Sequence, residues 1–115
     1  MKSSDAVAAL TALAQETRLA VFRLLVQAGE EGMAAGEIAL ELDVPAATLS
    51  FHLKELSRAG LVASRQAGRS VIYRAGYAAM DDLIAYLTDN CCQGGQCLPK
   101  TAAAAAVAKR RRKTA

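Results

Sequence analysis

The sequence has little of what membrane-spanning or secreted proteins contain. Its 115 residues include no tryptophan, one histidine, two prolines and only five aromatic side chains. No apolar run approaches the roughly 20 residues that a membrane helix needs. The start, M-K-S-S-D-A-V-A-A-L, also lacks the apolar stretch of a secretory signal. These absences predict a cytoplasmic protein with no membrane partner.

Large apolar side chains are scarce as well. Hydrophobic residues make up 53% of the chain, but alanine supplies much of that share. A single domain of this length buries only about two-thirds of the surface that its unfolded chain exposes. Association of two chains would therefore hide apolar surface that one chain leaves in water.

Positive charge is concentrated in two places. The formal net charge is +3, yet residues 109–113 alone carry five positive charges. Residues 1–108 hold nine Lys or Arg against eleven Asp or Glu, a net charge of −2. Within them, residues 43–75 have a net charge of +3 and follow an acidic segment, residues 30–43. An anionic partner is expected to approach the basic segment from one side.

Apolar residues at helical spacing predict two helices near the N-terminus. Ser4 is the expected N-cap of the first helix, and the second is expected over residues 15–28. The apolar stripes are Val7, Leu10 and Ala14 in the first helix and Leu19, Phe22 and Val26 in the second.

A helix-turn-helix follows. Residues 34–42 predict a short helix, and Pro45 forces a turn before the next one. That next helix has its apolar face at Leu49, Leu53 and Leu56 and ends at Gly60. Short hydroxyls, an imidazole and a cation on its other face suit contact with nucleic acid. These side chains are Thr48, Ser50, His52 and Lys54.

A hairpin and a last helix complete the expected fold. Residues 61–66 and 70–75 predict two strands joined at 67–69, with Arg65 and Arg69 at the tip to reach phosphates or the minor groove. Residues 77–90 predict a helix with an apolar stripe. The fold class is mainly α (α+β): a winged helix-turn-helix of about five helices plus a two-stranded β-wing, homodimeric through its terminal helices.

Three segments resemble the arsenic-repressor (ArsR/SmtB) family of bacterial metal-sensing repressors. They are A-x-E-T-R-L-x-V-F-R-L-L at Ala14–Leu25, I-A-x-E-L-D-V-P-A-A-T-L-S-F-H-L-K-E-L-x-x-A-G-L-V at Ile38–Val62, and R-x-A-G-R-S-V-I-Y-R at Arg65–Arg74. The resemblance covers about residues 5–90. It implies a homodimeric repressor that binds double-stranded operator DNA and leaves it on binding a metal or metalloid.

The resemblance also implies where DNA is contacted. Many members have Ser or Gln where this chain has Pro45-Ala46-Ala47, so this helix start offers backbone N–H groups to a phosphate instead of polar side chains. The operator sequence therefore does not follow from the resemblance. The residues expected at DNA are Ala46, Ala47, Thr48, Ser50, His52, Lys54, Arg65 and Arg69.

Two inducer sites that are common in the family are missing. Residues 33–38, before the turn, hold no cysteine, and the last helix has aspartates but no histidine. All three cysteines, Cys91, Cys92 and Cys97, lie instead in N-C-C-Q-G-G-Q-C. Three thiolates suit a soft ion, and As(III) or Sb(III) takes three sulfurs in a neutral complex, whereas zinc wants a fourth ligand. A methylated arsenic(III) needs only Cys91 and Cys92.

Other interpretations of the cysteines stay open. They include a redox switch through Cys97 and one neighbour, a structural disulfide, and incidental thiols. An enzyme is not expected, because the cysteines follow a helix and its negative end disfavours a thiolate. A winged-helix architectural protein without a sensing role is a further alternative.

The sequence thus predicts a repressor released by trivalent arsenic or antimony, with no constitutive cofactor. Its parts are a DNA-binding and dimerisation domain (1–90), an inducer loop (91–98) and an Ala-rich, basic tail (99–115) that could add salt-dependent DNA affinity.

Overall fold

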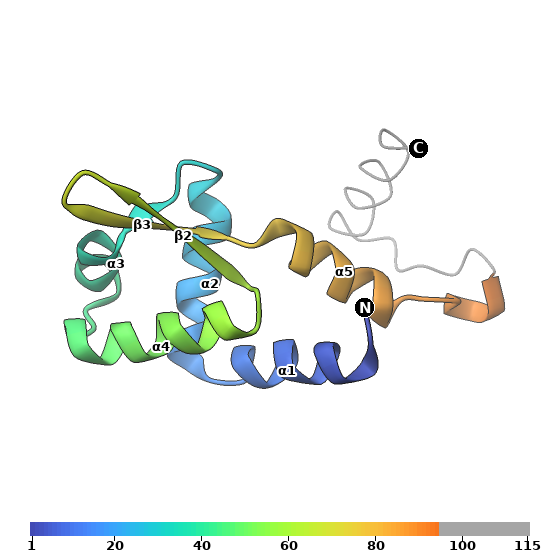
Figure 1. Ribbon diagram of the computed structural model, residues 1–115. Helices are drawn as coiled ribbons and strands as arrows, with labels where there is room; N and C mark the ends of the chain where they lie inside the picture. The colour runs from blue at the N-terminus through green and yellow to red at the C-terminus, as the bar shows by residue number, and fades with distance from the viewer. Residues whose placement is uncertain (95–115) are drawn as a thin grey trace.

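The computed structural model describes residues 1–94, which form five helices and a small sheet that lies along one edge of the molecule (Figure 1). The helices are α1 (Ser3–Leu13), α2 (Glu16–Ala28), α3 (Ala35–Leu42), α4 (Ala46–Arg58) and α5 (Tyr77–Leu87). The strands are β1 (Met33–Ala34), β2 (Val62–Ala67) and β3 (Ser70–Ala75). A short turn, Cys91–Gly94, follows α5, and Cys92 and Gln93 in it have left-handed backbone angles. The predicted winged helix-turn-helix is confirmed. Cys97 and the predicted tail, 99–115, lie outside the described residues.

The sheet has one strand more than the predicted wing. Its order is β1-β3-β2, and both pairings are antiparallel. The hairpin of β2 and β3 closes with Ala67 opposite Ser70, which leaves a two-residue turn, one residue shorter than the predicted turn at 67–69. β1 pairs Met33 with Tyr73 and ties the connection after α2 to the wing. Two residues are too few to show the alternating pattern that reveals a strand in sequence.

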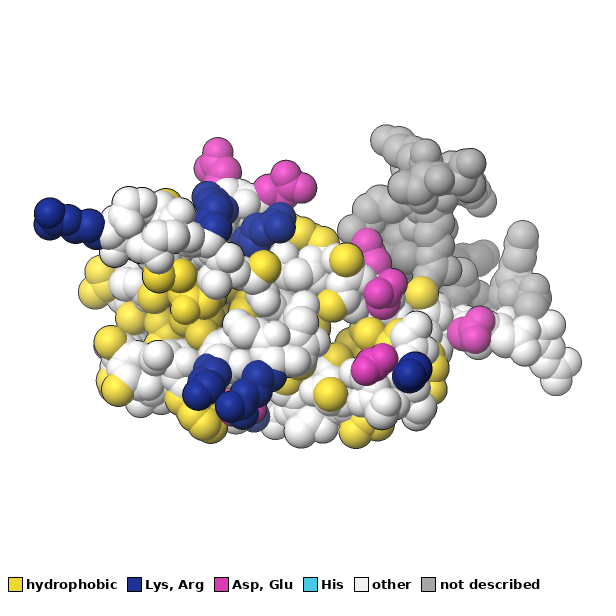
Figure 2. Space-filling view, viewed as in Figure 1, with side chains coloured by type: hydrophobic (Ala, Val, Ile, Leu, Met, Phe, Trp, Pro, Cys, Tyr) yellow, Lys and Arg dark blue, Asp and Glu magenta, His cyan; other side chains and the backbone are white. Residues whose placement is uncertain are grey.

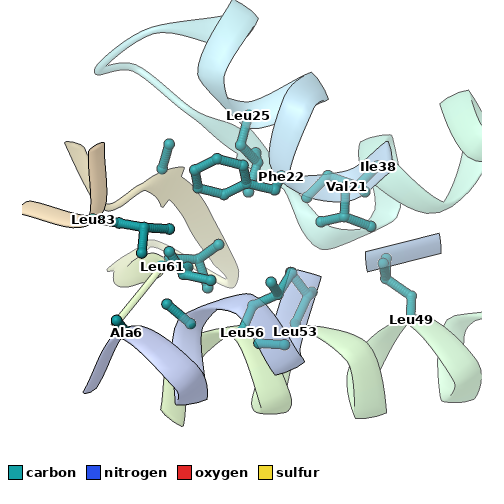
Figure 3. Close-up of a cluster of buried hydrophobic side chains, with 14 residues drawn as sticks. Ala6, Val21, Phe22, Leu25, Ile38, Leu49, Leu53, Leu56, Leu61 and Leu83 are labelled. Atoms are coloured by element: carbon teal, nitrogen blue, oxygen red, sulfur yellow. The ribbon is translucent and has the colours of Figure 1, made fainter. Parts of the chain in front are cut away.

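The core lies between α2, α4 and the base of the sheet, and α1 and α5 close its other sides (Figure 3). Leu49, Leu53 and Leu56 of α4 are all buried, as predicted. They meet apolar side chains of α2, α3 and the start of β2. These buried partners are Val21, Phe22, Leu25, Ile38, Leu61 and Val62. The packing fixes α4 by one face and leaves its opposite face outside.

Helix α1 presents a face other than the predicted one, and α2 differs from the prediction at one position. In α1 the buried residues are Ala6, Ala9 and Ala12, whereas Val7 is 58% and Leu10 is 44% exposed. Alanine lets two helix backbones approach closely, so the small side chains face the core and the larger ones face outward. In α2, Leu19 is exposed, whereas Phe22 is buried and Val26 packs against the core as predicted. Helix α1 begins at Ser3 with Lys2 as its N-cap. Ser4 lies inside the helix, so the prediction that Ser4 is the N-cap is wrong.

Helix α5 is shorter than the predicted 77–90. It buries Leu83 and leaves Tyr86 and Leu87 exposed, then ends at Leu87. Thr88 donates its hydroxyl to the Ile84 carbonyl at 2.8 Å, and Thr, Asp and Asn in succession favour local side-chain bonds over helix. Among residues 1–94, no helix is long and apolar enough to cross a membrane.

Candidate nucleic-acid interface

Helix α4 is held at both of its ends. Pro45 precedes its first turn, where a missing N–H costs nothing. At the other end Gly60 has φ +75°, and its N–H bonds the Ser57 carbonyl at 3.0 Å while that of Leu61 bonds the Leu56 carbonyl at 3.0 Å. This pair of bonds is the Schellman motif, for which glycine is preferred. The predicted glycine cap is confirmed.

The outward face of α4 contains most, but not all, of the predicted DNA contacts. Ala46, Ala47, Thr48, Ser50 and Lys54 are exposed. At 3.6 residues per turn, positions 47, 51, 54 and 58 form the stripe directly opposite the buried leucines. Backbone and side chains on this face are therefore available to a ligand along the whole helix.

His52 does not belong to this face, so its prediction as an outward, groove-facing residue is wrong. Its side chain is 7% exposed. Position 52 lies three residues after Leu49 and four before Leu56, which places it on the same face as these two buried leucines. The Nδ1 atom of His52 is buried without a hydrogen-bond partner among the described residues. Burial, and then the positive charge of Arg18, lower the pKa of His52 below 6.5.

Phe51 takes the place on this face that was expected for His52. Its side chain is 56% exposed although it is aromatic. The ring meets the His52 ring edge-on, with centroids 5.6 Å apart and an interplanar angle of 64°. Helical spacing is sufficient to find it, because residue 51 is two residues, or about 200° around the helix, from both buried positions 49 and 53. Arg58 is a second exposed residue that sequence reasoning missed, and it pairs with Glu55 at 3.3 Å.

The wing places its two arginines differently. Arg69 lies in the turn of the hairpin and is exposed. Arg65 lies within β2, opposite Ile72, and donates from its guanidinium to the Glu31 carbonyl at 3.0 Å. Of these two arginines, Arg69 alone is at the tip, so the expectation that both lie there is corrected.

Acidic and basic side chains are unevenly distributed over the face in Figure 2. In Figure 2 basic side chains lie along α4 and on the hairpin, and one projects from the hairpin end of the molecule. The acidic side chains on this view lie above the α2–β1 connection and towards α1 and α5. The basic elements are those that a helix-turn-helix protein turns towards nucleic acid.

The described cysteines lie at the far end of the molecule from the hairpin, beyond α5 (Figure 1). The Sγ atoms of Cys91 and Cys92 are 3.8 Å apart. Two sulfurs bound to one ion at about 2.3 Å are roughly 3.3–3.8 Å apart for ordinary bond angles. Cys92 is disulfide-bonded in this structure, so it is a potential ligand only after reduction. Within residues 1–94 no group of three metal-ligating side chains is assembled.

A close backbone contact joins α5 to the end of α4. The Gly76 N–H, at the start of α5, bonds the Leu61 carbonyl at 2.7 Å. A side chain at Gly76 would overlap the Gly60 carbonyl oxygen, so only glycine fits here without movement. The start of α5 therefore lies directly against the glycine cap of α4.

Residues 13–65 match the family described as a helix-turn-helix domain. The transcriptional activator HlyU of Vibrio cholerae is 32% identical over 94 residues, which are 82% of this chain and 84% of HlyU. A putative arsenical resistance operon repressor, ArsR, of Halobacterium salinarum is 43% identical over 63 residues. Those residues cover 55% of this chain but only 48% of that protein. The chain likewise spans 58% of the regulator YceK of Bacillus subtilis, to which it is 39% identical over 59 residues.

The similar solved structures are also transcriptional regulators or their DNA-binding domains. An ArsR-like transcriptional regulator from Rhodococcus has a TM-score of 0.65 at 30% identity, over 73% of this chain and 76% of that one. Reduced HlyU from Vibrio cholerae has a TM-score of 0.62 at 31% identity, over 78% and 92%. A homodimeric winged helix-turn-helix DNA-binding domain from Mycobacterium bovis has a TM-score of 0.61 at 25% identity, over 84% and 89%.

Proposed function

This chain belongs to the ArsR/HlyU family of winged-helix transcriptional regulators, and from that membership we propose that it is a homodimeric repressor released from its operator by trivalent arsenic or antimony. Members of this family are DNA-binding regulators and not enzymes. The proposal adds an arrangement of subunits, a direction of regulation and an inducer to that assignment.

The DNA-binding step uses α4 and the wing. The exposed face of α4 enters the major groove, with Lys54 near the backbone and the N–H groups of Ala46 and Ala47 near a phosphate. Arg69 at the hairpin turn contacts the backbone or minor groove beside it. His52 supports α4 from inside the core and makes no base contact.

The dimer uses the apolar side chains that the fold leaves in water on the two terminal helices. Met1, Val7 and Leu10 at the N-terminus and Tyr86 and Leu87 on α5 are exposed large hydrophobics. A two-fold axis through this surface would cover it and place two α4 helices about one DNA turn apart. A homodimeric structural neighbour supports this arrangement.

The inducer step rests on one observation, the place of Cys91 and Cys92 next to each other shortly after the end of α5, with their sulfurs 3.8 Å apart. In the reduced chain these thiolates, with Cys97, hold the trivalent ion. Binding of the ion draws the cysteines together and shifts α5. The contact between Gly76 and Leu61 then transmits this shift to α4. The name of the Halobacterium relative, an arsenical resistance operon repressor, agrees with this ligand.

A redox-sensing regulator is the second candidate. The adjacent sulfurs of Cys91 and Cys92 and the solved structure of reduced HlyU favour it. The third candidate is a repressor selective for methylarsenite, which would need only Cys91 and Cys92. The three candidates differ in the thiols that they require and in whether an oxidant replaces the metalloid.

The test begins with duplexes of roughly 30 bp, about three DNA turns, selected from a random library by the reduced full-length protein. Affinity for the best of these, called the selected duplex, is measured with arsenite, antimonite, methylarsenite, zinc or hydrogen peroxide. We expect arsenite and antimonite to weaken binding by about 5- to 150-fold.

Three variants assign the thiols. Cys97→Ser should lose the arsenite response and keep the methylarsenite response. The Cys91→Ser, Cys92→Ser double variant should lose both responses yet keep its affinity in the absence of inducer. Release of the double variant by arsenite would contradict the site, and release of the wild type by peroxide alone would favour the redox switch.

A further inference from the structure

Phe51 is an aromatic side chain exposed at the centre of the reading face of α4. It is 56% exposed, and Ala47, one turn earlier on the same stripe, is exposed as well. The other exposed large hydrophobics lie outside α4. They are Met1, Val7, Leu10, Leu19, Leu40, Tyr86 and Leu87. Phe51 and Ala47 therefore form an isolated apolar spot within a polar surface.

The ring of Phe51 contacts the ring of the buried His52. His52 is buried, and its ring meets that of Phe51 edge-on at a centroid distance of 5.6 Å. Edge-to-face pairs of this kind restrain aromatic orientation. The buried neighbour thus gives Phe51 a preferred direction, which a group that reads a ligand by shape requires.

The surroundings of the spot indicate its partner. Ser50, Lys54 and Arg58 border it, so hydroxyl and basic groups surround the ring instead of further aliphatic side chains. A protein partner would favour a broader apolar patch. Double-stranded DNA matches basic flanks, and the apolar group that it offers in the major groove is the 5-methyl of thymine.

We propose that Phe51, together with Ala47, recognises the 5-methyl group of a thymine in each half-site of the operator. This inference rests on the proposed function, because it needs α4 in the major groove. It assigns a base preference to a helix whose start has few polar side chains. Cytosine presents no methyl at that place, and 5-methylcytosine does.

The test removes the methyl without changing base pairing. In the selected duplex each thymine pair related by symmetry is replaced in turn by deoxyuridine, and binding of the full-length protein is measured by fluorescence anisotropy. At one position per half-site the wild type should lose about fourfold in affinity per methyl removed. The Phe51→Ala variant should bind the thymine and deoxyuridine duplexes equally, and Phe51→Leu should keep part of the difference.

A matched control separates this contact from a general loss of apolar surface. Leu40 on α3 is 86% exposed, and Leu40→Ala should retain the wild-type sensitivity to deoxyuridine. Tighter binding of the wild type to 5-methylcytosine than to cytosine at the same position, each paired with guanine, would support the methyl contact. Thermal unfolding of each variant shows whether it is folded.

The failures can be distinguished. If wild type and Phe51→Ala respond equally to deoxyuridine at every position, the thymine contact is wrong while sequence-specific binding stands. If the wild type enriches no sequence from the library, operator binding itself is contradicted, and this inference with it.

Discussion

At the scale of single residues, His52 shows how a polar side chain on a reading helix can act from inside the core. It is buried on the same face of α4 as Leu49 and Leu56, and its Nδ1 has no hydrogen-bond partner among residues 1–94. Protonation would place a charge in this site near the Arg18 guanidinium, and burial opposes that charge first. The neutral imidazole is therefore the form that the folded protein accommodates.

Stability should consequently depend on pH through His52. Because its folded pKa lies below the unfolded value of 6.5, the unfolded chain takes up the proton first as pH falls. The contribution is fully present above pH 6.5 and is lost as pH drops towards the folded pKa. Denaturant unfolding at fixed protein concentration should show the wild type losing stability relative to His52→Gln between about pH 7 and pH 5. Parallel profiles for the two proteins would contradict this account of His52.

The residue scale also shows what the sequence could predict about α4. Leu49, Leu53 and Leu56 were assigned to the core correctly, because their spacing is helical and their side chains are apolar. The sequence prediction places His52 on the outward face because its side chain is polar, and it leaves Phe51 out because its side chain is apolar. Both assignments are wrong. The helical period places 52 inside and 51 outside, and burial of the leucines on both sides outweighs the preference of an imidazole for water.

At the scale of elements, the contact between the start of α5 and the cap of α4 is the central feature. Glycine patterns in sequence do not reveal it, because it depends on the approach of Gly76 to Gly60, which are 16 residues apart in sequence. β1 was missed for a related reason, since its two residues are a strand only by pairing with β3.

Gly76→Ala should test the contact. The added Cβ would overlap the Gly60 carbonyl oxygen and lie 3.2 Å from the Leu61 carbonyl carbon. We expect a loss of about 1–3 kcal/mol in the free energy of unfolding and a smaller effect of arsenite on DNA affinity. Gly36→Ala is the control, because nothing lies within 4 Å of its Cβ position. A destabilised Gly76→Ala protein with a normal arsenite response would exclude this contact as the path.

The wing makes a separate prediction. Arg69 is at the hairpin turn, whereas the Arg65 guanidinium already donates to the Glu31 carbonyl. If each Arg69 of the dimer neutralises one phosphate, Arg69→Gln should reduce the slope of log affinity against log salt by about 0.9 for each subunit, or about 1.8 for the dimer. Arg65→Gln should change the slope less. The salt dependence of anisotropy titrations measures both slopes, and the reverse order would show that Arg65 is the residue of the wing that binds phosphate.

At the scale of the whole molecule, apolar surface on α1 and α5 remains uncovered in the single chain. The scarcity of large hydrophobics correctly indicated that one chain would leave such surface exposed. The faces involved could not be assigned from sequence, because in α1 the alanines and not Val7 or Leu10 face the core.

Leu87→Asp should weaken self-association. Leu87 is 58% exposed on α5, and burial of one leucine contributes about 1.5–3 kcal/mol, which a symmetric interface counts twice. Sedimentation equilibrium should show a dissociation constant raised at least about 100-fold, with DNA affinity reduced in parallel. Leu40→Asp, on α3, should leave association unchanged. Equal association of the Leu87→Asp variant and the wild type would remove α5 from the interface.

The proposed switch requires that arsenite binding at the cysteines beyond α5 changes DNA binding at α4. Coupling of this kind is reciprocal, so the factor by which arsenite weakens DNA binding must equal the factor by which DNA weakens arsenite binding. The most direct test is to titrate the reduced full-length protein with arsenite, with and without saturating selected duplex. We predict that the arsenite dissociation constant rises on DNA by the factor seen for release, and that the rise vanishes in the Cys91→Ser, Cys92→Ser variant. An arsenite affinity that is the same on and off DNA would contradict the proposed switch.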